Sequence, residues 1–191
     1  MFHFILPFFS LGDCNGNNTQ RKTTQRSLQE QNKGYCYFEG IFLSYDEVID
    51  AAKKISDEYP RYPLGPKSIH VSTEFRPAVT HEDLYGTEVS VHITGYKYGT
   101  VTDPKDGTTS ENEGFRVEVQ SEIAKMQELL DSIKKNWHIS ISYTISSKYT
   151  EYMDFTDAEP VSITLTGKFG SVDSNGKLIT RIGDGSSCKE P

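Results

Sequence analysis

The sequence lacks the features that mark several large classes of protein. Its 191 residues include no apolar run of the roughly 20 residues that a membrane-spanning helix needs. The chain carries 20 lysine and arginine residues against 27 aspartate and glutamate residues, a formal net charge of −7, and no basic patch interleaved with aromatic residues. Because phosphate binding needs clustered positive charge, we expect no nucleic-acid partner.

Motifs for catalysis and for tight metal binding are also missing. The chain has no G-x-S-x-G nucleophile elbow and neither of the glycine-rich phosphate-binding fingerprints. Glycoside hydrolysis needs two carboxylates held across a cleft. The pairs Glu111/Glu113 and Asp154/Asp157 instead lie in polar stretches with no sign of a pocket. We therefore predict a protein that is not an enzyme and that has no cofactor and no metal site.

Cysteine is scarce, and the first of the three cysteines follows an apolar start. The opening residues, MFHFILPFFSL, suit the apolar core of a secretion signal. The next stretch, LGDC, resembles the lipobox of bacterial lipoproteins, in which the cysteine is lipidated; Leu11 and Gly12 fit that pattern and Asp13 departs from it. The resemblance implies a signal and lipid-anchor segment at residues 1–14 with Cys14 lipidated. A signal without lipidation and a buried N-terminal strand are the alternatives.

A polar linker and a cysteine pair come next. Residues 15–33 have almost no apolar content, so they cannot offset the entropy of ordering, and we expect a flexible tether or an ordinary disordered terminus. Cys36 and Cys188 flank the rest of the chain, and a disulfide between them would add about 2–4 kcal/mol in an oxidising compartment. We predict the bacterial cell envelope, as a periplasmic or outer-membrane lipoprotein, or secretion. Free thiols in a reducing cell are the alternative.

Two stretches of the chain are nearly the same. VSVHITGYKYGTV begins at Val89 and VSITLTGKFGSV begins at Val161, and they align with one gap at Tyr96. Each runs into an Asp-Gly or Asn-Gly turn, DPKDG or DSNG, which are strong hairpin signals. Upstream, SIHVSTEF and WHISISYT both alternate apolar and polar residues, as half-buried strands do.

An amphipathic helix precedes each of these segments. Residues 44–58 open with a Ser44/Glu47 capping box, and residues 121–136 show apolar residues at helical spacing. We therefore predict an α+β domain over residues 34–191, built from a tandem α-β-β-β repeat at about 44–120 and 121–183. The halves share one antiparallel sheet of about six strands with both helices on one face; two separate layers are the alternative.

This layout resembles the beta-lactamase inhibitory protein family, in which two helix-plus-strands repeats build one curved sheet that grips a partner protein. The resemblance is one of topology over residues 44–182, so it assigns no functional residues.

Strand parity predicts which side chains face the helices and which face outward. The inward set is Ile69, Val71, Phe75, Val89, Val91, Ile93, Ile139, Ile141, Tyr143, Ile145, Val161, Ile163 and Leu165. The outward set includes the candidate binding residues His70, Ser72, Ser90, His92, Thr94, Ser140, Ser162 and Thr164. This outward set is either a solvated sheet face, since threonine favours strands without any ligand, or a hydrogen-bonding platform. If His70 and His92 lie on adjacent strands, they and Glu74 could hold zinc.

A second candidate surface is the aromatic stretch KYTEYMDF, residues 148–155. Tyr149 and Tyr152 here are typical partner contacts if the loop is exposed; a lid on the core is the alternative. We predict a non-enzymatic cell-envelope protein that binds a protein or glycan through the sheet face or these aromatic loops. A small-ligand carrier or hydrolase with a site between the repeats, and a soluble immunity or inhibitor protein, are the alternatives.

Overall fold

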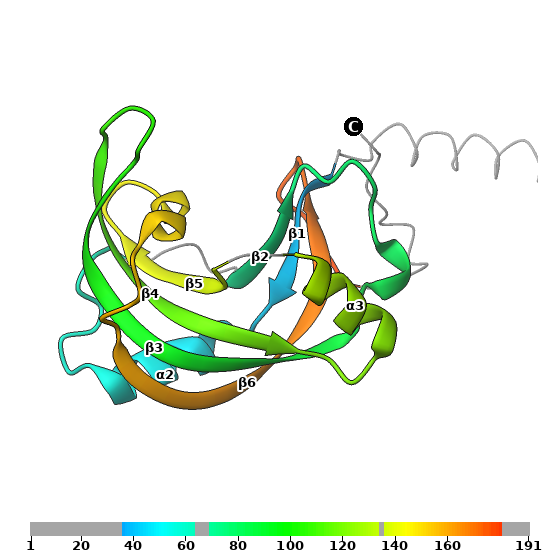
Figure 1. Cartoon of the computed structure of the whole chain (residues 1–191), viewed down its shortest axis with the longest axis horizontal. Coiled ribbons are helices and arrows are strands. Elements are labelled where there is room, and N and C mark those ends of the chain that lie inside the picture. The colour runs from blue at the N-terminus through cyan, green and yellow to red at the C-terminus, as the bar shows by residue number, and fades with distance from the viewer. Residues whose placement is uncertain (1–35, 64–68, 134–135, 181–191) are drawn as a thin grey trace, which may run out of the picture. The chain divides into compact units, whose positions relative to one another are not determined.

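The computed structural model describes residues 36–63, 69–133 and 136–180 (Figure 1). The first elements are β1 (Cys36–Phe42), α2 (Tyr45–Ile55), β2 (His70–Phe75), the 3₁₀ helix η1 (Glu82–Leu84) and β3 (Glu88–Thr102). Then come β4 (Thr109–Gln120), α3 (Ala124–Ser132), β5 (His138–Tyr143), the 3₁₀ helix η2 (Ser147–Tyr152), β6 (Glu159–Asp173) and β7 (Leu178–Ile179). The predicted signal, the lipidation of Cys14, the linker and Cys188 lie outside the described residues.

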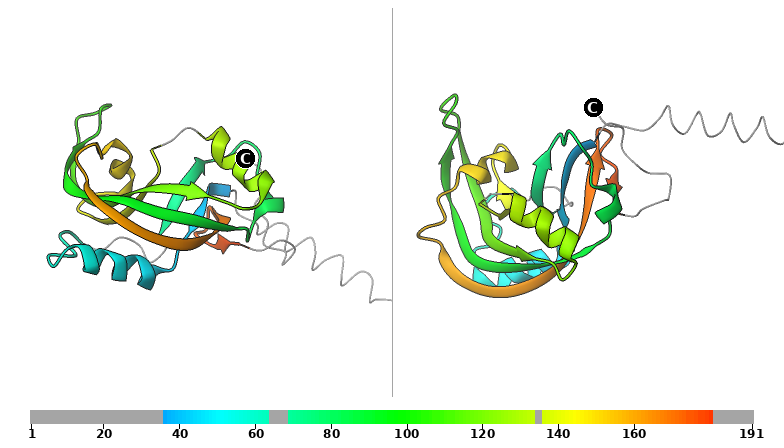
Figure 2. Two further views of the ribbon diagram at one scale, coloured as in Figure 1. Left: turned by 60° about the horizontal axis from the view of Figure 1, so that its bottom comes forward. Right: turned by 45° about the vertical axis from the view of Figure 1, so that its right-hand side comes forward.

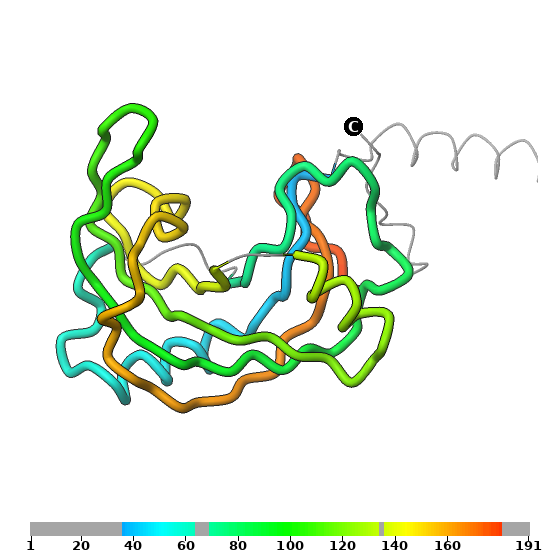
Figure 3. Tube along the Cα trace, viewed as in Figure 1, coloured from blue at the N-terminus to red at the C-terminus, as the bar shows by residue number. Residues whose placement is uncertain are grey.

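All the strands pair antiparallel in one sheet of order β2-β1-β6-β3-β4-β5, with β7 added on β6. An α+β architecture on an antiparallel sheet is therefore confirmed. The long strands β3, β4 and β6 curve along their length (Figure 3). Among the described residues, no helix has the length and hydrophobicity to cross a bilayer.

The two similar stretches of sequence form the two central strands, which are neighbours. In the register of β3 and β6, Val91 lies opposite Leu165, His92 opposite Thr164, and Ile93 opposite Ile163. The sequence alignment that puts Val89 over Val161 also puts His92 over Thr164. His92 and Thr164 are therefore equivalent in the alignment of the two stretches and also lie directly opposite each other in the sheet.

The alternation of strand residues places the core as parity predicts. Val89, Val91 and Ile93 are fully buried, while the residues between them are exposed or half-buried. Three members of the predicted inward set are not in the core: Phe75 is 58% exposed, Ile145 is 57% exposed, and Tyr143 is half-buried and belongs to neither hydrophobic cluster. Phe75 is the last residue of β2, and Ile145 lies beyond the end of β5, so neither has a continuing strand to hold it against the core.

Both helices contribute to the hydrophobic core that the strands build. α2 lies against β6 and buries Val48, Ile49, Ala51 and Ala52, whereas α3 lies against β4 and buries Met126 and Leu130 (Figure 2). Ser44 is the N-cap of α2, and its hydroxyl accepts from the Glu47 amide at 3.5 Å. That contact satisfies one of the free amides that begin a helix, as the sequence predicts.

The two edge strands of the sheet, β2 and β5, lie close to each other (Figure 1). The backbone amide of Tyr143, at the end of β5, donates to the carbonyl of Pro63, which precedes β2, at 3.0 Å. The sheet is curved enough to bring its flanks together, and its inward residues form one core.

Candidate functional site

The outward side chains of the two central strands form a polar surface, which we call the hydroxyl face. Its members are Ser90, His92 and Thr94 of β3 and Ser162, Thr164 and Thr166 of β6. The two serines and both β6 threonines are exposed, and His92 and Thr94 are half-buried. The structure thus brings together the predicted outward residues of β3 and β6 along the centre of the sheet.

Hydrogen bonds order the hydroxyl face. His92 Nδ1 and Thr164 Oγ1 are hydrogen-bonded at 3.0 Å across the two strands. At one end of the face, Arg116 Nε of β4 donates to Thr94 Oγ1 at 3.0 Å. Glu118 of β4 lies opposite His92 in register, so the centre of the face combines hydroxyl groups, an imidazole and a carboxylate.

Other predicted site residues lie elsewhere on the sheet. His70 and Ser72 are on β2, which β1 and β6 separate from β3, so His70 and His92 are not on adjacent strands. The His70 ring packs 4.5 Å from the ring of Phe38. Ser140 of β5 donates to the carbonyl of Ser147 at 3.1 Å. Within the described ranges, no group of three or more His, Cys, Asp and Glu side chains could hold a metal ion.

The aromatic stretch at residues 148–155 is a lid rather than an exposed loop. Tyr149, Met153 and Phe155 are buried with Val101 in a second, smaller hydrophobic core, and Tyr152 packs against it half-buried. With 4% of its surface exposed, Tyr149 has little area to offer a partner. The sequence could not decide between these alternatives because both use the same aromatic residues.

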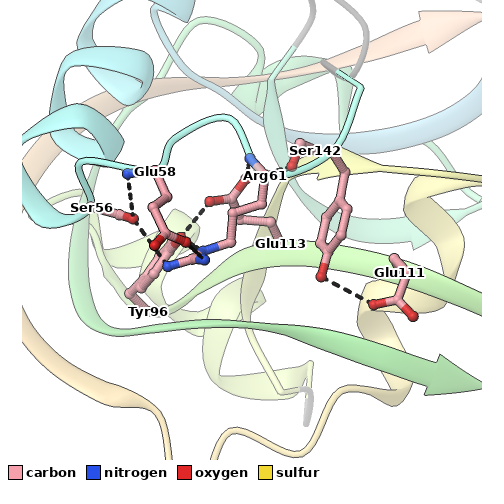
Figure 4. Close-up of polar contacts among 8 residues, drawn as sticks. Ser56, Glu58, Arg61, Tyr96, Glu111, Glu113 and Ser142 are labelled. Atoms are coloured by element: carbon pink, nitrogen blue, oxygen red, sulfur yellow. Dashed lines mark hydrogen bonds and ion pairs between the residues drawn. The ribbon is translucent and has the colours of Figure 1, made fainter.

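A polar cluster built around a buried carboxylate, shown in Figure 4, was not predicted from the sequence. Glu113 of β4 is 0% exposed. Its Oε1 accepts from the hydroxyl of Tyr96, and its Oε2 accepts from the hydroxyl of Ser142 and from the backbone amide of Arg61, the last at 3.3 Å. Both oxygens of this carboxylate are therefore occupied by donors from three different segments.

Arg61 connects residues 58–62, the segment that follows α2, to this cluster. Its Nε donates to the Tyr96 hydroxyl at 3.4 Å, and its guanidinium carbon lies 3.5 Å from the centroid of the Tyr98 ring. It also pairs with Glu58. The next residue, Tyr62, donates to Glu111 Oε2 at 3.0 Å. Residues 58–62 are thus held on β3 and β4 by charge, stacking and hydrogen bonds together.

The phenols of this cluster are shifted toward their protonated forms. Burial, with the hydrogen bond to Glu113, raises the pKa of Tyr96 to about 12. Burial and the hydrogen bond to Glu111 raise the pKa of Tyr62 to about 12 as well. Burial raises the pKa of Tyr59 too, and its hydroxyl oxygen is buried without a hydrogen-bond partner among the described residues.

A second buried carboxylate, Glu39 of β1, is 1% exposed. It accepts from the backbone amide of His81, from the His81 ring at Nδ1 and from the Tyr85 hydroxyl, each at 2.8 Å. Cys36 Sγ lies 3.7 Å from the same hydroxyl. Cys36 is disulfide-bonded; because the other cysteines lie outside the described residues, its pairing with Cys188 stays a prediction.

The two buried glutamates share a local setting. Each is followed by a glycine, Gly40 or Gly114, and each Glu-Gly pair marks a register shift against the neighbouring edge strand. The stretches FEGIF and NEGFR show this likeness in the sequence. A glutamate before a glycine inside a strand pattern is therefore the signal that could have found both sites, since such a glycine often marks a bulge.

Comparison with known protein families, with curated proteins and with solved structures found no match.

Proposed function

We propose that this chain is a non-enzymatic binding protein that takes a protein or glycan partner on the hydroxyl face. The observation that carries the proposal is the ordered row of serine, threonine and histidine side chains on the outward side of β3 and β6, with His92 bonded to Thr164. Hydroxyl and imidazole groups supply donors and acceptors at low side-chain entropy cost. A sheet holds them at fixed spacing, so a partner need not order them.

The buried carboxylates favour binding over catalysis as the role of this chain. Glu113 and Glu39 each accept hydrogen bonds from three donors, so both are engaged in holding segments together. A general base must instead be within reach of a proton on a substrate.

We further propose that the protein acts at the cell envelope, held by a lipid on Cys14 and a tether at residues 15–33. The sequence alone supports this part, through the lipobox-like LGDC and the apolar residues before it. Mass spectrometry of the mature N-terminus tests the proposed lipid anchor on Cys14. A mature protein that begins with an unmodified Met1 would contradict this proposal.

An internal duplication with both helices on the inward face is also part of the proposal. Two observations support the duplication: the order strand, helix, strand, 3₁₀ helix, strand occurs twice, and the Glu-Gly pairs match. These observations favour units that each begin with a strand, β1 or β4, ahead of the helix. The burial of Val48 of α2 and Met126 of α3 in the same hydrophobic core supports the placement of the helices.

The experiment on the hydroxyl face compares two equal substitutions on exposed threonines. Thr164→Arg places a bulky cation at the centre of the face, and Thr102→Arg places it at the far end of β3, beside the hairpin turn. Both proteins and the parent are tested on arrays of purified envelope glycans and purified envelope proteins. We expect Thr164→Arg to weaken partner binding by about tenfold or more and Thr102→Arg to leave it unchanged. Equal binding by all three would overturn the hydroxyl face as the binding surface.

A second candidate function is a small-ligand carrier with its site between the two halves. The specific observation is the buried hydroxyl of Tyr59, which has no hydrogen-bond partner among the described residues and whose pKa is raised by burial. An unpaired buried hydroxyl costs about 1–3 kcal/mol, and a bound acceptor would remove that cost. Native mass spectrometry of the protein and of Tyr59→Phe tests this: a co-purifying mass lost in the variant supports a carrier, and no such mass opposes it.

A further inference from the structure

Five aromatic rings lie in one chain of contacts on the edge pair β1 and β2. The Tyr37 and Phe75 rings meet edge to face with centroids 4.8 Å apart, and Tyr37 lies 6.2 Å from Phe38. Phe38 then contacts His70 at 4.5 Å and Phe42 at 5.8 Å. The series runs from a buried end at Phe42 to an exposed end at Phe75.

The exposed end is what we call the aromatic corner, made of Tyr37, Phe75 and Arg76. Tyr37 is 43% exposed and Phe75 is 58% exposed. The guanidinium carbon of Arg76 lies 5.4 Å from the Phe75 centroid. The backbone of Arg76 has φ +52°, which residues other than glycine adopt rarely. The amide of Arg76 donates to the Tyr37 carbonyl at 2.9 Å. Two large rings are therefore presented together on an ordered backbone.

The chemistry of the aromatic corner matches a membrane interface. Tyr37 has an apolar ring with a polar hydroxyl, the type of side chain that gathers at the headgroup level of bilayers. The exposed Phe75 ring adds apolar surface that lipid can cover, and arginine buries its stem while its charge stays in water. The exposed Glu74 beside the corner and the net charge of −7 oppose binding to anionic lipid. The lipid that fits is therefore zwitterionic.

The position of the aromatic corner also indicates a membrane. The 35 residues that precede the described structure join it at Cys36, and Tyr37 is the next residue of β1. They carry the apolar run and Cys14. A chain anchored through these residues is tethered at the corner end of β1.

We propose that the aromatic corner rests on the zwitterionic lipid surface of the membrane that anchors the chain. The proposal depends on the proposed anchoring at the N-terminus and is independent of the hydroxyl face. It gives the protein a fixed orientation, with one flank of the sheet against the membrane.

Fluorescence quenching with a matched control position tests this orientation. The chain has one tryptophan, Trp137, which is replaced by phenylalanine in both test proteins. One then carries Phe75→Trp and the other Ile145→Trp; the native side chains are 58% and 57% exposed. Each full-length protein also carries Cys36→Ser and Cys188→Ser, so that Cys14 is the single thiol, and is coupled through Cys14 to a thiol-reactive lipid in phosphatidylcholine vesicles, with or without brominated acyl chains.

We expect brominated lipid to lower the emission of tryptophan at position 75 by about twofold and to leave position 145 nearly unchanged, because bromine quenches only rings within the interface. Equal quenching at both positions, or none at either, overturns the proposal. Loss of binding to the protein array by Tyr37→Ser/Phe75→Ser, without quenching at position 75, assigns the corner to a protein partner and also overturns it. The Thr164→Arg result is unaffected by either outcome, so the two proposals fail separately.

Discussion

Gly40 and Gly114 occupy matching places on the two flanks of the sheet. A Cβ atom at Gly40 would lie 2.8 Å from the carbonyl oxygen of Val71, and one at Gly114 would lie 2.8 Å from the carbonyl oxygen of Ile139. Real Cβ atoms do not approach backbone oxygens so closely. Each edge strand therefore packs where its neighbour has no side chain.

This arrangement predicts that Gly40→Ala and Gly114→Ala destabilise the protein to a similar degree. Each should lower the free energy of unfolding by about 1–3 kcal/mol, since overpacking forces the backbone to shift. Urea denaturation measures the loss. Ser90→Ala on the exposed side of β3 is the control and should change it by less than about 0.5 kcal/mol. Alanine tolerated at one glycine and not at the other would contradict the matched packing.

The hydrogen bonds to Glu113 predict a large effect of removing its carboxylate. Glu113→Ala leaves the Tyr96 hydroxyl, the Ser142 hydroxyl and the Arg61 amide without their acceptor. We expect a loss of about 3 kcal/mol or more in the free energy of unfolding, because buried donors left unpaired each cost about 1–3 kcal/mol. The matched variant Glu111→Ala removes a half-buried carboxylate and should cost about 1 kcal/mol. Equal losses in the two variants would show that the burial of Glu113 adds nothing to the free energy of unfolding beyond what a half-buried carboxylate contributes.

The raised phenol pKa values predict loss of stability at high pH. Tyr96 and Tyr62 have pKa values of about 12 in the folded protein, against the ordinary 10.0. The folded state thus holds these protons more tightly than the unfolded state. Their contribution is complete below pH 10 and is lost as the pH rises from about 10 to about 12. Urea midpoints across this range measure it, and Tyr96→Phe/Tyr62→Phe should show a shallower decline. An identical decline in that variant would place the effect on other groups.

Two side-chain contacts hold the segment around η1, and they predict unequal contributions to its stability. The contact of His81 with buried Glu39 should stabilise the segment more than the exposed ion pair of Asp83 with Lys125. His81→Ala removes the ring contact with buried Glu39, whereas Lys125→Ala removes the exposed ion pair between Lys125 and Asp83. Exposed pairs contribute about 0–1 kcal/mol. Hydrogen exchange should therefore rise at the amides of Leu84 and Tyr85 in His81→Ala and change little in Lys125→Ala. Faster exchange in the lysine variant would reverse this ranking.

Turns and most of the strand burial, which depend on residues close together in the chain, were predicted correctly from the sequence. The Asp-Gly and Asn-Gly turns hold Gly107 and Gly176 at φ +74° and +78°, conformations that glycine adopts without strain. Alternation likewise predicted the burial of Val89 and Val91. Helix ends were predicted less well: α2 and α3 end earlier than the apolar spacing indicates.

The order of the strands and the buried polar sites depend on contacts between distant residues, which alternation does not encode. β1 lies between β2 and β6, and no local pattern in residues 36–42 indicates either neighbour. The polar residues Glu111 and Asn112 indicate a solvated stretch around Glu113, although Glu113 is buried in β4. Its partners Arg61 and Ser142 lie 52 and 29 residues away in the chain, so no local pattern could reveal that it is buried.

The approach of β2 to β5 affects how this protein can associate with others. An open sheet flank offers unpaired amides and carbonyls to any passing strand, a common origin of aggregation. Here the two edge strands lie close together, and the amide of Tyr143 donates to the carbonyl of Pro63. Where these edges approach each other, a passing strand has little room to pair with either one, so recognition at that place depends on side chains.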